Sequence, residues 1–236
     1  MLAALEQAPK GDVVLLHACC HNPTGFDLSH DDWRRVLDVV RRRELLPLID
    51  FAYQGFGDGL EQDAWSTRLF AAELPEVPMT SSCSKNFGRY RDRTGALIVC
   101  AKSADKLLDI RSQLANIARN LWSTPPDHGA AVVATILGDP ELKSIWADEV
   151  EAMRLRIAQL RSGLVEALEP HGLRERFAHI GVQRGMFSYT GLTAEQVKQL
   201  RDHHSVYMVN SGRANVAGID ATRLALLAEA IAEVCK

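Results

Sequence analysis

The stretch "DVVLLHACC", residues 12–20, decides the fold, because it is a short and continuous apolar run rich in valine and leucine. A run of this kind favours a strand that is buried on both faces, as strands of parallel sheets are. It ends at "HNPTG" (21–25), after which Ser29 can cap an amphipathic helix. A second apolar run, "LPLIDFAY" (46–53), then predicts a second buried strand.

The alternation of strands and helices continues along the chain. The segment "VPMTSSCS" (77–84) is a weaker candidate for a third strand, and "GALIVCA" (95–101) is a candidate for a fourth. Strands that alternate with helices are most economically arranged as a largely parallel sheet with helices on its faces. The sequence therefore predicts an α/β fold with three layers, α/β/α.

Helices dominate the pattern after Ser103. Apolar residues recur at helical spacing up to residue 121, and a long helix is expected over 141–169. The remaining elements that we expect are short strands within 180–192 and 204–219, a helix over 193–203 and a last helix over 220–234. We therefore expect a large domain over residues 1–150 and a smaller α/β domain over residues 151–236, bridged by the long helix.

Composition and charge favour a globular protein that binds small molecules. The chain has 236 residues, of which 47% are hydrophobic, and its 27 basic and 30 acidic residues give a net charge of -3. This balance gives no reason to expect nucleic acid or an anionic membrane as a partner. No apolar stretch approaches the roughly 18 residues of a membrane-spanning helix, and the first residues lack the pattern of a secretory signal. We expect a cytoplasmic protein.

The cysteines favour neither a disulfide framework nor a metal site. There are five, an odd number, and their spacing suits free thiols in a reducing compartment. The stretch "HACCH" (17–21) combines histidine with cysteine, but its spacing does not match the usual Cys-x-x-Cys or His-x-x-x-His ligand patterns. We therefore expect no metal.

Polar side chains gather where the expected strands end, and open parallel sheets bind their ligands at that edge. These side chains belong to Asn22 after the first strand, Asp50 and Tyr53 after the second, Ser82, Ser84 and Lys85 after the third, and Arg93 before the fourth. Each has a simpler explanation when taken alone, such as a turn, a helix cap, a core aromatic or a solvated charge. A carboxylate, a phenol, an amide, a lysine and an arginine at one edge together indicate a binding crevice.

Four segments give the chain a resemblance to aspartate and aromatic amino-acid aminotransferases of fold type I. They are "NPTG" (22–25), "DFAYQGF" (50–56), "SCSKNFGRYRDRTG" (82–95) and "NSGRANVAG" (210–218), in the order and approximate spacing of that family. The resemblance implies pyridoxal 5'-phosphate as cofactor and a large cofactor-binding domain followed by a smaller one. Relatives have an amino-terminal segment before the first strand seen here, so the chain resembles their carboxyl-terminal part and the large domain is expected to be incomplete.

The resemblance also implies roles for the residues that would bind the cofactor. Lys85 resembles the lysine that forms the Schiff base and moves the proton between the substrate and the cofactor. Asp50 matches the carboxylate that faces the pyridine nitrogen, and Tyr53 and Asn22 match the pair that hydrogen-bonds the 3'-oxygen. Ser82 and Arg93 match ligands of the phosphate, for which a planar guanidinium is well suited.

Two arginines correspond to substrate-binding residues of the family. Arg213 matches the arginine whose fork holds the α-carboxylate of the substrate, and Asn22 is expected to bind the substrate as well as the cofactor. Arg119 lies where members that act on dicarboxylates carry a second arginine, contributed across a dimer interface. The sequence around Arg119 departs from the commoner pattern, so a solvated arginine is the alternative there.

By resemblance, the function is transamination between aspartate or an aromatic amino acid and 2-oxoglutarate, in a homodimer. Two alternatives stay open, a catalytically inactive fragment that acts only through association and a lyase that uses the same cofactor. The sequence does not decide between aspartate and aromatic substrates. We expect the isolated chain to be nearly inactive, and its uncovered strand edge and apolar helix faces to favour association.

Overall fold

The computed structural model describes residues 1–236, which form two compact units. The first unit contains Met1–Ala18, Leu28–Gln54 and Leu60–Asp148. The second unit contains Cys19–Asp27, Gly55–Gly59 and Glu149–Lys236. Two short loop segments early in the chain thus belong to the same unit as the carboxyl-terminal residues.

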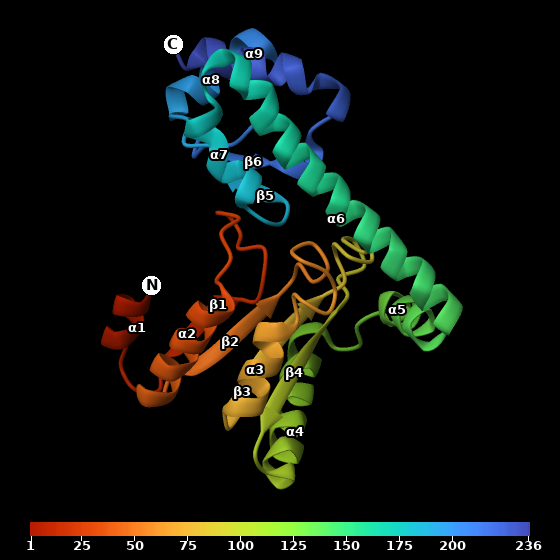
Figure 1. The fold of residues 1–236 in the computed structure, drawn as a ribbon. Helices are drawn as coiled ribbons and strands as arrows, with labels where there is room; N and C mark the ends of the chain where they lie inside the picture. Colours follow the sequence, from red (N-terminus) through yellow and green to blue (C-terminus); the bar gives the residue numbers. More distant parts are fainter. The chain divides into compact units, whose positions relative to one another are not determined.

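The first unit is built on a four-stranded sheet whose strands lie in chain order (Figure 1). They are β1 (Val13–His17), β2 (Leu46–Phe51), β3 (Glu76–Ser82) and β4 (Gly95–Ala101). The first three strands are parallel, whereas β4 is antiparallel to β3. The expectation of an α/β fold with a mostly parallel sheet is confirmed. The last strand reverses direction because residues 83–94 form a loop without the crossover helix that a parallel connection needs.

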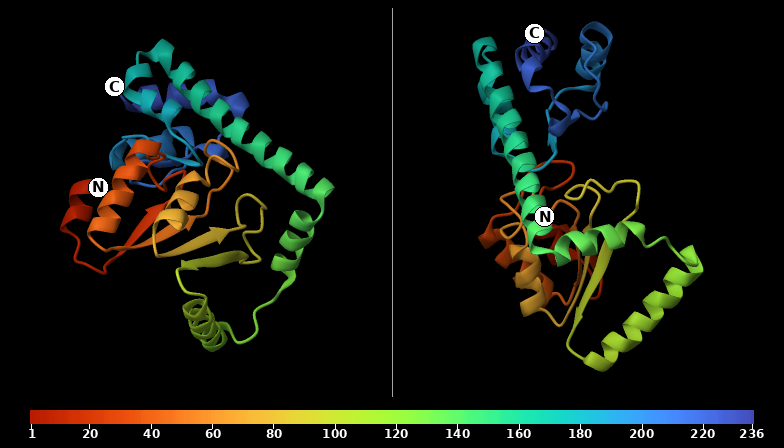
Figure 2. Two further views of the ribbon diagram at one scale, coloured as in Figure 1. Left: turned by 60° about the horizontal axis from the view of Figure 1, so that its bottom comes forward. Right: turned by 90° about the vertical axis from the view of Figure 1, so that its right-hand side faces the viewer.

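Helices α2 (His30–Arg42) and α3 (Trp65–Glu73) cover one face of this sheet (Figure 2). The hydroxyl of Ser29 accepts a hydrogen bond from the backbone N–H of Asp32, which confirms the predicted cap of α2. Trp33 on α2 is buried and meets Phe70 on α3 edge to face, with ring centroids 5.5 Å apart. These contacts form the apolar core of the first unit.

The opposite face of β1 is open, which corrects the expectation that this strand is buried on both faces. Val13 and Leu15 are each 61% exposed, while Leu16, which points to the α2 side, is buried. Helix α4 (Ala104–Trp122) runs beside β4 on that open side and buries none of its own residues (Figure 2). The chain therefore supplies no layer over β1 on one side of the sheet.

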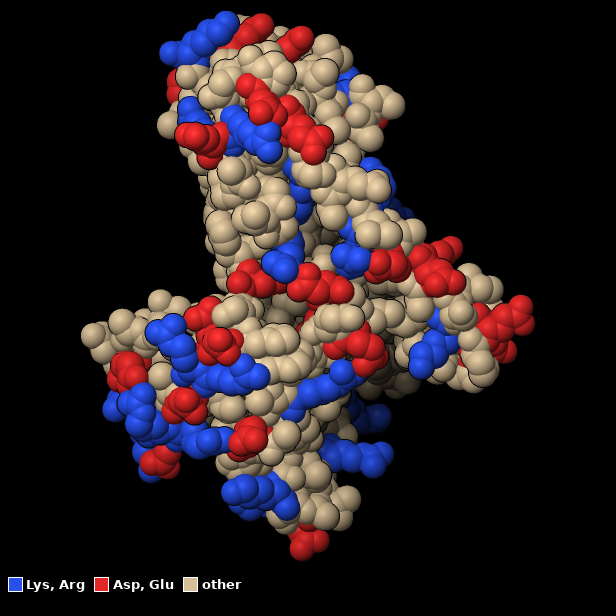
Figure 3. All heavy atoms as spheres, in the orientation of Figure 1, with Lys and Arg blue, Asp and Glu red and all other residues tan.

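Three further helices complete the first unit or lead out of it, namely α1 (Leu2–Gln7), α5 (His128–Gly138) and α6 (Pro140–Leu168). Helix α6 is the long helix that the sequence predicts, and its residues after Asp148 belong to the second unit. Basic and acidic side chains are interleaved on the face shown in Figure 3, and pairs such as Arg42 with Glu6 and Arg41 with Glu73 connect neighbouring helices.

The second unit packs helices against a two-stranded sheet. Its elements besides α6 are α7 (Arg174–Val182), β5 (Phe187–Tyr189), α8 (Ala194–His204), β6 (Arg213–Asn215) and α9 (Leu224–Val234), with single-turn helices at Glu169–His171, Val216–Gly218 and Ala221–Arg223. Strands β5 and β6 are antiparallel. The segment 180–192, in which we expect short strands, contains β5, but its first residues, 180–182, end helix α7, because Phe177 and Ile180 lie three residues apart and bury the same helical face.

No helix in either unit combines the length and the apolar character needed to cross a membrane.

Candidate active site

Asp50 lies at the carboxyl end of β2, beside His17 at the end of β1. The parallel register places these two residues opposite each other, and His17 Nε2 lies 3.9 Å from Asp50 Oδ2. The other carboxylate oxygen accepts a hydrogen bond from the backbone N–H of Ala52 at 3.0 Å. Sequence reasoning considered His17 only as a metal ligand. The strand register, which pairs the two strand ends, is the signal that could have identified it as a partner of Asp50.

Lys85 follows β3 and lies against Tyr53, which follows β2. The ammonium nitrogen of Lys85 is 4.2 Å from the centroid of the Tyr53 ring, and Tyr53 is only 6% exposed. Burial lowers the pKa of Lys85, the Asp50 carboxylate opposes that shift, and the positive charge of Arg93 adds to it. The amine therefore spends a larger fraction of its time neutral, the form in which it is a nucleophile or a base.

Ser82 and Arg93 lie on either side of the same loop. The hydroxyl of Ser82 accepts a hydrogen bond from the backbone N–H of Ser84 at 3.2 Å. Arg93 is exposed, has a φ of 53°, and donates to the carbonyl oxygen of Tyr90 at 3.1 Å. Gly129 of α5 approaches this loop so closely that a Cβ at that position would be 1.9 Å from Thr94 Oγ1. The loop that carries Arg93 is thus packed against α5, where only glycine fits.

Asn86 and Phe87 anchor the chain directly after Lys85. The Asn86 amide donates to the carbonyl oxygen of Gln54 at 3.2 Å, which ties Lys85 to the loop after Tyr53. The indole N–H of Trp146 donates to the carbonyl oxygen of Asn86 at 2.7 Å, and its ring stacks on Phe87 with centroids 4.5 Å apart. Sequence reasoning missed Trp146, which lies 60 residues from Asn86 and shares no motif with it.

Asn22 and Arg213 meet in the second unit. Arg213, in β6, has a guanidinium nitrogen 3.4 Å from Asn22 Oδ1. Its guanidinium carbon lies 5.0 Å from the centroid of the Phe187 ring in β5, a contact that sequence reasoning did not identify. Asn22 precedes Pro23 through a cis peptide bond. A guanidinium beside an amide is a donor set that suits a carboxylate.

Arg119 stands apart from both groups. It lies in the last turn of α4, is exposed, and makes no ion pair or side-chain hydrogen bond within the chain. The structure therefore does not bring Arg119 to any of the other candidate residues.

The chain matches the family model of class I and II aminotransferases over residues 1–231. It is 79% identical over 235 residues to an aromatic-amino-acid aminotransferase of Pseudomonas aeruginosa, covering 100% of this chain and 59% of that protein. It is 44% identical to an aspartate aminotransferase of the same organism, covering 99% of this chain and again 59% of the relative. The chain thus spans about 59% of the length of these curated relatives.

The solved structures agree with the family model. A crystal structure of an aromatic-amino-acid aminotransferase from Burkholderia pseudomallei, covalently bound to pyridoxal phosphate, superimposes with a TM-score of 0.97 at 47% identity. The match covers 100% of this chain and 59% of that one. With a family model over nearly all of its residues and a fold shared at this level, the chain belongs to the class I and II aminotransferases.

Proposed function

We propose that the chain carries the catalytic lysine and the carboxylate-binding pair of a pyridoxal-phosphate-dependent transaminase. The observation that supports this most strongly is Lys85, a half-buried amine with a lowered pKa that lies against Tyr53 and near Asp50. An amine whose neutral form is favoured by burial, and which lies beside a carboxylate and a phenol, is suited to nucleophilic attack on an aldehyde and to proton transfer.

The candidate residues of the first unit offer a suitable polar partner for each polar group of the cofactor. Asp50 offers a carboxylate for a protonated ring nitrogen, and Tyr53 offers a phenol for a ring oxygen. Ser82 and Arg93 offer a hydroxyl and a guanidinium for a phosphate. When bound, the cofactor supplies an electron sink for the pair that remains when the Cα–H bond of an amino acid breaks. Lys85 Nζ would accept that proton and move it between the substrate and the cofactor, a role that suits an amine whose pKa is lowered by burial.

In the second unit, Arg213 and Asn22 would bind the α-carboxylate of the substrate. The guanidinium offers two parallel N–H donors and the amide offers a third, so the carboxylate would be fixed in orientation as well as in place. Holding the carboxylate fixes the direction of the Cα–H bond, which is the part of the substrate that must react.

We favour aromatic amino acids as donors and 2-oxoglutarate as acceptor. The support is the 79% identity to an aromatic-amino-acid aminotransferase, compared with 44% to the aspartate enzyme of the same organism. The exposed position of Arg119 adds no support for a dicarboxylate preference. Competition between phenylalanine and aspartate for the cofactor-loaded protein would decide the preference, and equal or better use of aspartate would overturn it.

The experiment that tests the role of Lys85 does not need turnover. The chain is incubated with pyridoxal phosphate, reduced with borohydride and digested, and the labelled peptide is identified by mass spectrometry. We expect the label on Lys85 and its loss in Lys85→Arg, while the matched control Lys143→Arg keeps it. A label that is spread over the other lysines, or that survives in Lys85→Arg, contradicts the proposal.

We also propose that the protein works as a homodimer. The support is helix α4, which buries none of its residues and whose Leu108, Leu121 and Trp122 are each exposed by more than half. Sedimentation velocity over a range of concentrations tests this, and a monomer at all concentrations would contradict it.

A further inference from the structure

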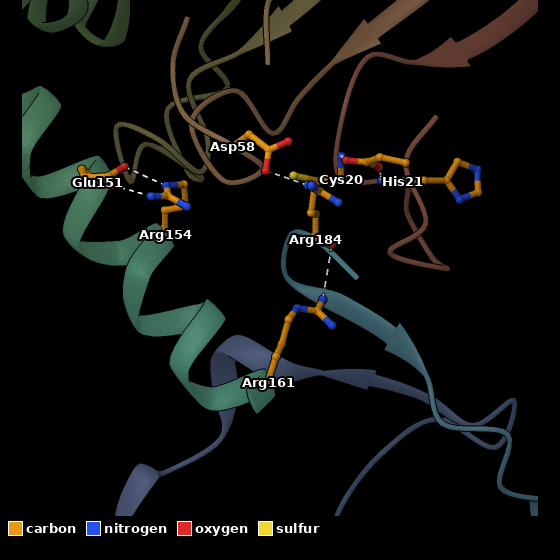
Figure 4. A network of polar contacts seen from close by, with 8 residues as sticks. Cys20, His21, Asp58, Glu151, Arg154, Arg161 and Arg184 are labelled. Atoms are coloured by element: carbon orange, nitrogen blue, oxygen red, sulfur yellow. Dashed lines mark hydrogen bonds and ion pairs between the residues drawn. The ribbon is translucent and has the colours of Figure 1, made fainter. Parts of the chain in front are cut away.

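Arg161 of α6 is a buried arginine whose side chain holds a single stretch of backbone. It is 2% exposed, and Figure 4 shows it reaching from α6 toward the segment that carries Arg184. Its guanidinium donates five hydrogen bonds, all to residues 180–188. The acceptors are the carbonyl oxygens of Ile180 at 3.1 Å, Arg184 at 3.3 Å, Gly185 at 2.6 Å and Phe187 at 2.8 Å, and the hydroxyl of Ser188 at 2.6 Å.

No carboxylate accepts a hydrogen bond from this buried charge. Burial lowers the pKa of Arg161 to about 10, so the side chain is still protonated at neutral pH. A buried charge is costly, and an apolar side chain of similar volume often serves stability as well. An apolar side chain cannot bind four carbonyl groups that converge on one point. The two terminal nitrogens of the Arg161 guanidinium bind all of them, while its Nε has no hydrogen-bond partner. The residue is therefore suited to fixing backbone geometry.

One side of the segment held by Arg161 contacts the turn that carries Asn22. The backbone N–H of Arg184 donates to the carbonyl oxygen of Gly25 at 2.8 Å. Gly185 lies so close to Cys20 that a Cβ at position 185 would be 2.4 Å from the Cys20 Cβ. The turn over residues 20–25 is thus docked on the segment by a hydrogen bond and by a contact that only glycine permits.

The other side of the segment contacts the strand that carries Arg213. In the antiparallel pair β5–β6, Tyr189 lies opposite Arg213, and the backbone N–H of Val216 donates to the carbonyl oxygen of Met186 at 2.8 Å. The ring of Phe187, whose carbonyl oxygen Arg161 binds, is the ring that lies against the guanidinium of Arg213. Both members of the Asn22–Arg213 pair therefore rest on the backbone that Arg161 holds.

From this arrangement we infer that Arg161 is a positioning residue for carboxylate binding, which keeps Asn22 and Arg213 at their mutual distance without touching the substrate. The inference rests on the proposed function, since it assumes that this pair binds the α-carboxylate. Loss of the Arg161 hydrogen bonds should let residues 184–188 move and should misalign the pair. The core of the second unit is built from other residues and should stay folded.

The test compares Arg161→Lys and Arg161→Met with the matched control Arg174→Lys, an exposed arginine of the same unit that pairs with Glu169. Amide hydrogen exchange is followed at Arg184 and Val216, whose N–H groups tie the segment to its two neighbours, and at Leu200 and Ile231 in the core. We expect exchange about tenfold faster or more at Arg184 and Val216, the equivalent of one lost charge-assisted hydrogen bond, with no change at the core amides. The control should leave all four rates unchanged.

A second readout follows the side-chain Nε–H resonance of Arg213 during titration with 3-phenylpropionate, a monocarboxylate. We expect Arg161→Met to weaken the apparent affinity about tenfold and Arg161→Lys to restore part of it, since lysine keeps the charge but not the fork. If Arg161 variants do not fold, Ser188→Ala removes a single acceptor and should give the same local exchange pattern with a smaller change.

Uniformly faster exchange across the second unit, or no change at Arg184 and Val216, overturns the inference, because either result means that Arg161 does not act locally. If the Arg213 Nε–H resonance of the wild-type chain does not shift when 3-phenylpropionate is added, the proposed function is contradicted instead. The exchange pattern alone then decides whether Arg161 positions the pair.

Discussion

The second unit packs its apolar side chains into one cluster that includes Leu168, Phe177 and Leu200, whereas the first unit leaves one side of its sheet open. Strand alternation places Asp50 and Ser82 on the same side of the sheet as the exposed Val13 and Leu15. Two residues of the proposed cofactor site thus share a face with uncovered apolar surface. The proposed carboxylate-binding pair therefore lies in the unit with a closed apolar core, whereas the proposed lysine site lies in the unit whose sheet is covered on one side only.

The tryptophans let the two units be observed separately. All four, Trp33, Trp65, Trp122 and Trp146, lie in the first unit. Tryptophan fluorescence therefore reports unfolding of the first unit, while far-ultraviolet circular dichroism reports the helices of both.

The largest effect is expected from Phe177→Ala, which empties a fully buried position in the core of the second unit. We expect a loss of about 3–5 kcal/mol in the free energy of unfolding of that unit. Urea denaturation should show the loss by circular dichroism but not by tryptophan fluorescence. The matched control is Phe26→Ala, the same substitution at an exposed position of the same unit. An equal shift in tryptophan fluorescence would break the comparison, because the two units would then unfold together.

A smaller effect, confined to the first unit, is expected from Ser29→Ala. This change removes the hydroxyl that accepts the N–H of Asp32 at the start of α2, and we expect a loss of about 1 kcal/mol. Here tryptophan fluorescence should move, since Trp33 lies one turn into the same helix. Ser29→Asp keeps a capping oxygen and should recover most of the stability. If Ser29→Asp is no more stable to unfolding than Ser29→Ala, the capping hydrogen bond contributes nothing to stability.

The third prediction concerns the titration of Lys85 and leaves folding intact. Asp50→Asn should lower the pKa of Lys85 further, because it removes the carboxylate that favours the ammonium, and Arg93→Gln should raise it, because it removes a repelling charge. The 13C resonance of the Lys85 side chain, assigned with Lys85→Arg, follows both shifts. Shifts in the same direction in the two variants would contradict this account of the site.

The sign of the stability effect follows from the same pKa. Since the pKa is lower in the folded chain, the unfolded chain binds more protons between the two pKa values, and raising the pH through that window favours the folded state. Asp50→Asn should widen the pH range between the folded and unfolded pKa of Lys85, because it lowers the folded pKa further. Arg93→Gln should narrow that range, because it raises the folded pKa.

The smallest effect on stability is expected from Leu121→Ser on the exposed side of α4, within about 0.5 kcal/mol. Binding of a hydrophobic dye should nevertheless fall, because this side chain is part of the uncovered apolar surface of the first unit. Leu226→Ser, at an exposed position of the second unit, is the matched control and should change dye binding less. Equal losses of dye binding in Leu121→Ser and Leu226→Ser would contradict the claim that the first unit has the larger uncovered apolar surface.

The fold class could be predicted from the sequence because it depends on local patterns. The apolar runs, the helical spacing after Ser29 and the long helix over 141–169 all match elements of the structure. The open face of β1 could not be predicted, since an apolar run shows that a strand can be buried and not whether a layer exists to bury it. The direction of β4 was in principle readable from the lack of a helix between residues 82 and 95.

The candidate residues were found in the sequence in two ways. The family resemblance led to Arg213, which lies 3.4 Å from Asn22, and the rule that ligands bind at strand ends led to others. That rule led to Lys85 and Tyr53, and the structure places the amine over the ring. Contacts that depend on tertiary packing carried no such signal. Trp146 contacts Asn86, which lies 60 residues away in the sequence. In the sequence alone, Arg161 cannot be distinguished from the other charged residues of the long helix, because its acceptors, such as the carbonyl oxygen of Gly185, are brought to it by the fold.

The acceptors around Arg161 also set how freely this part of the chain can vary over evolution. Four of the five are main-chain carbonyl oxygens, which every amino acid possesses. The side chains at positions 180, 184 and 187 can therefore change through mutation without removing an acceptor, whereas a single substitution at position 161 removes all five hydrogen bonds at once. Among related sequences, we expect more substitutions at an exposed position of the segment, such as 184, than at Arg161, whose loss removes every hydrogen bond, or at Gly185, where only glycine fits beside Cys20.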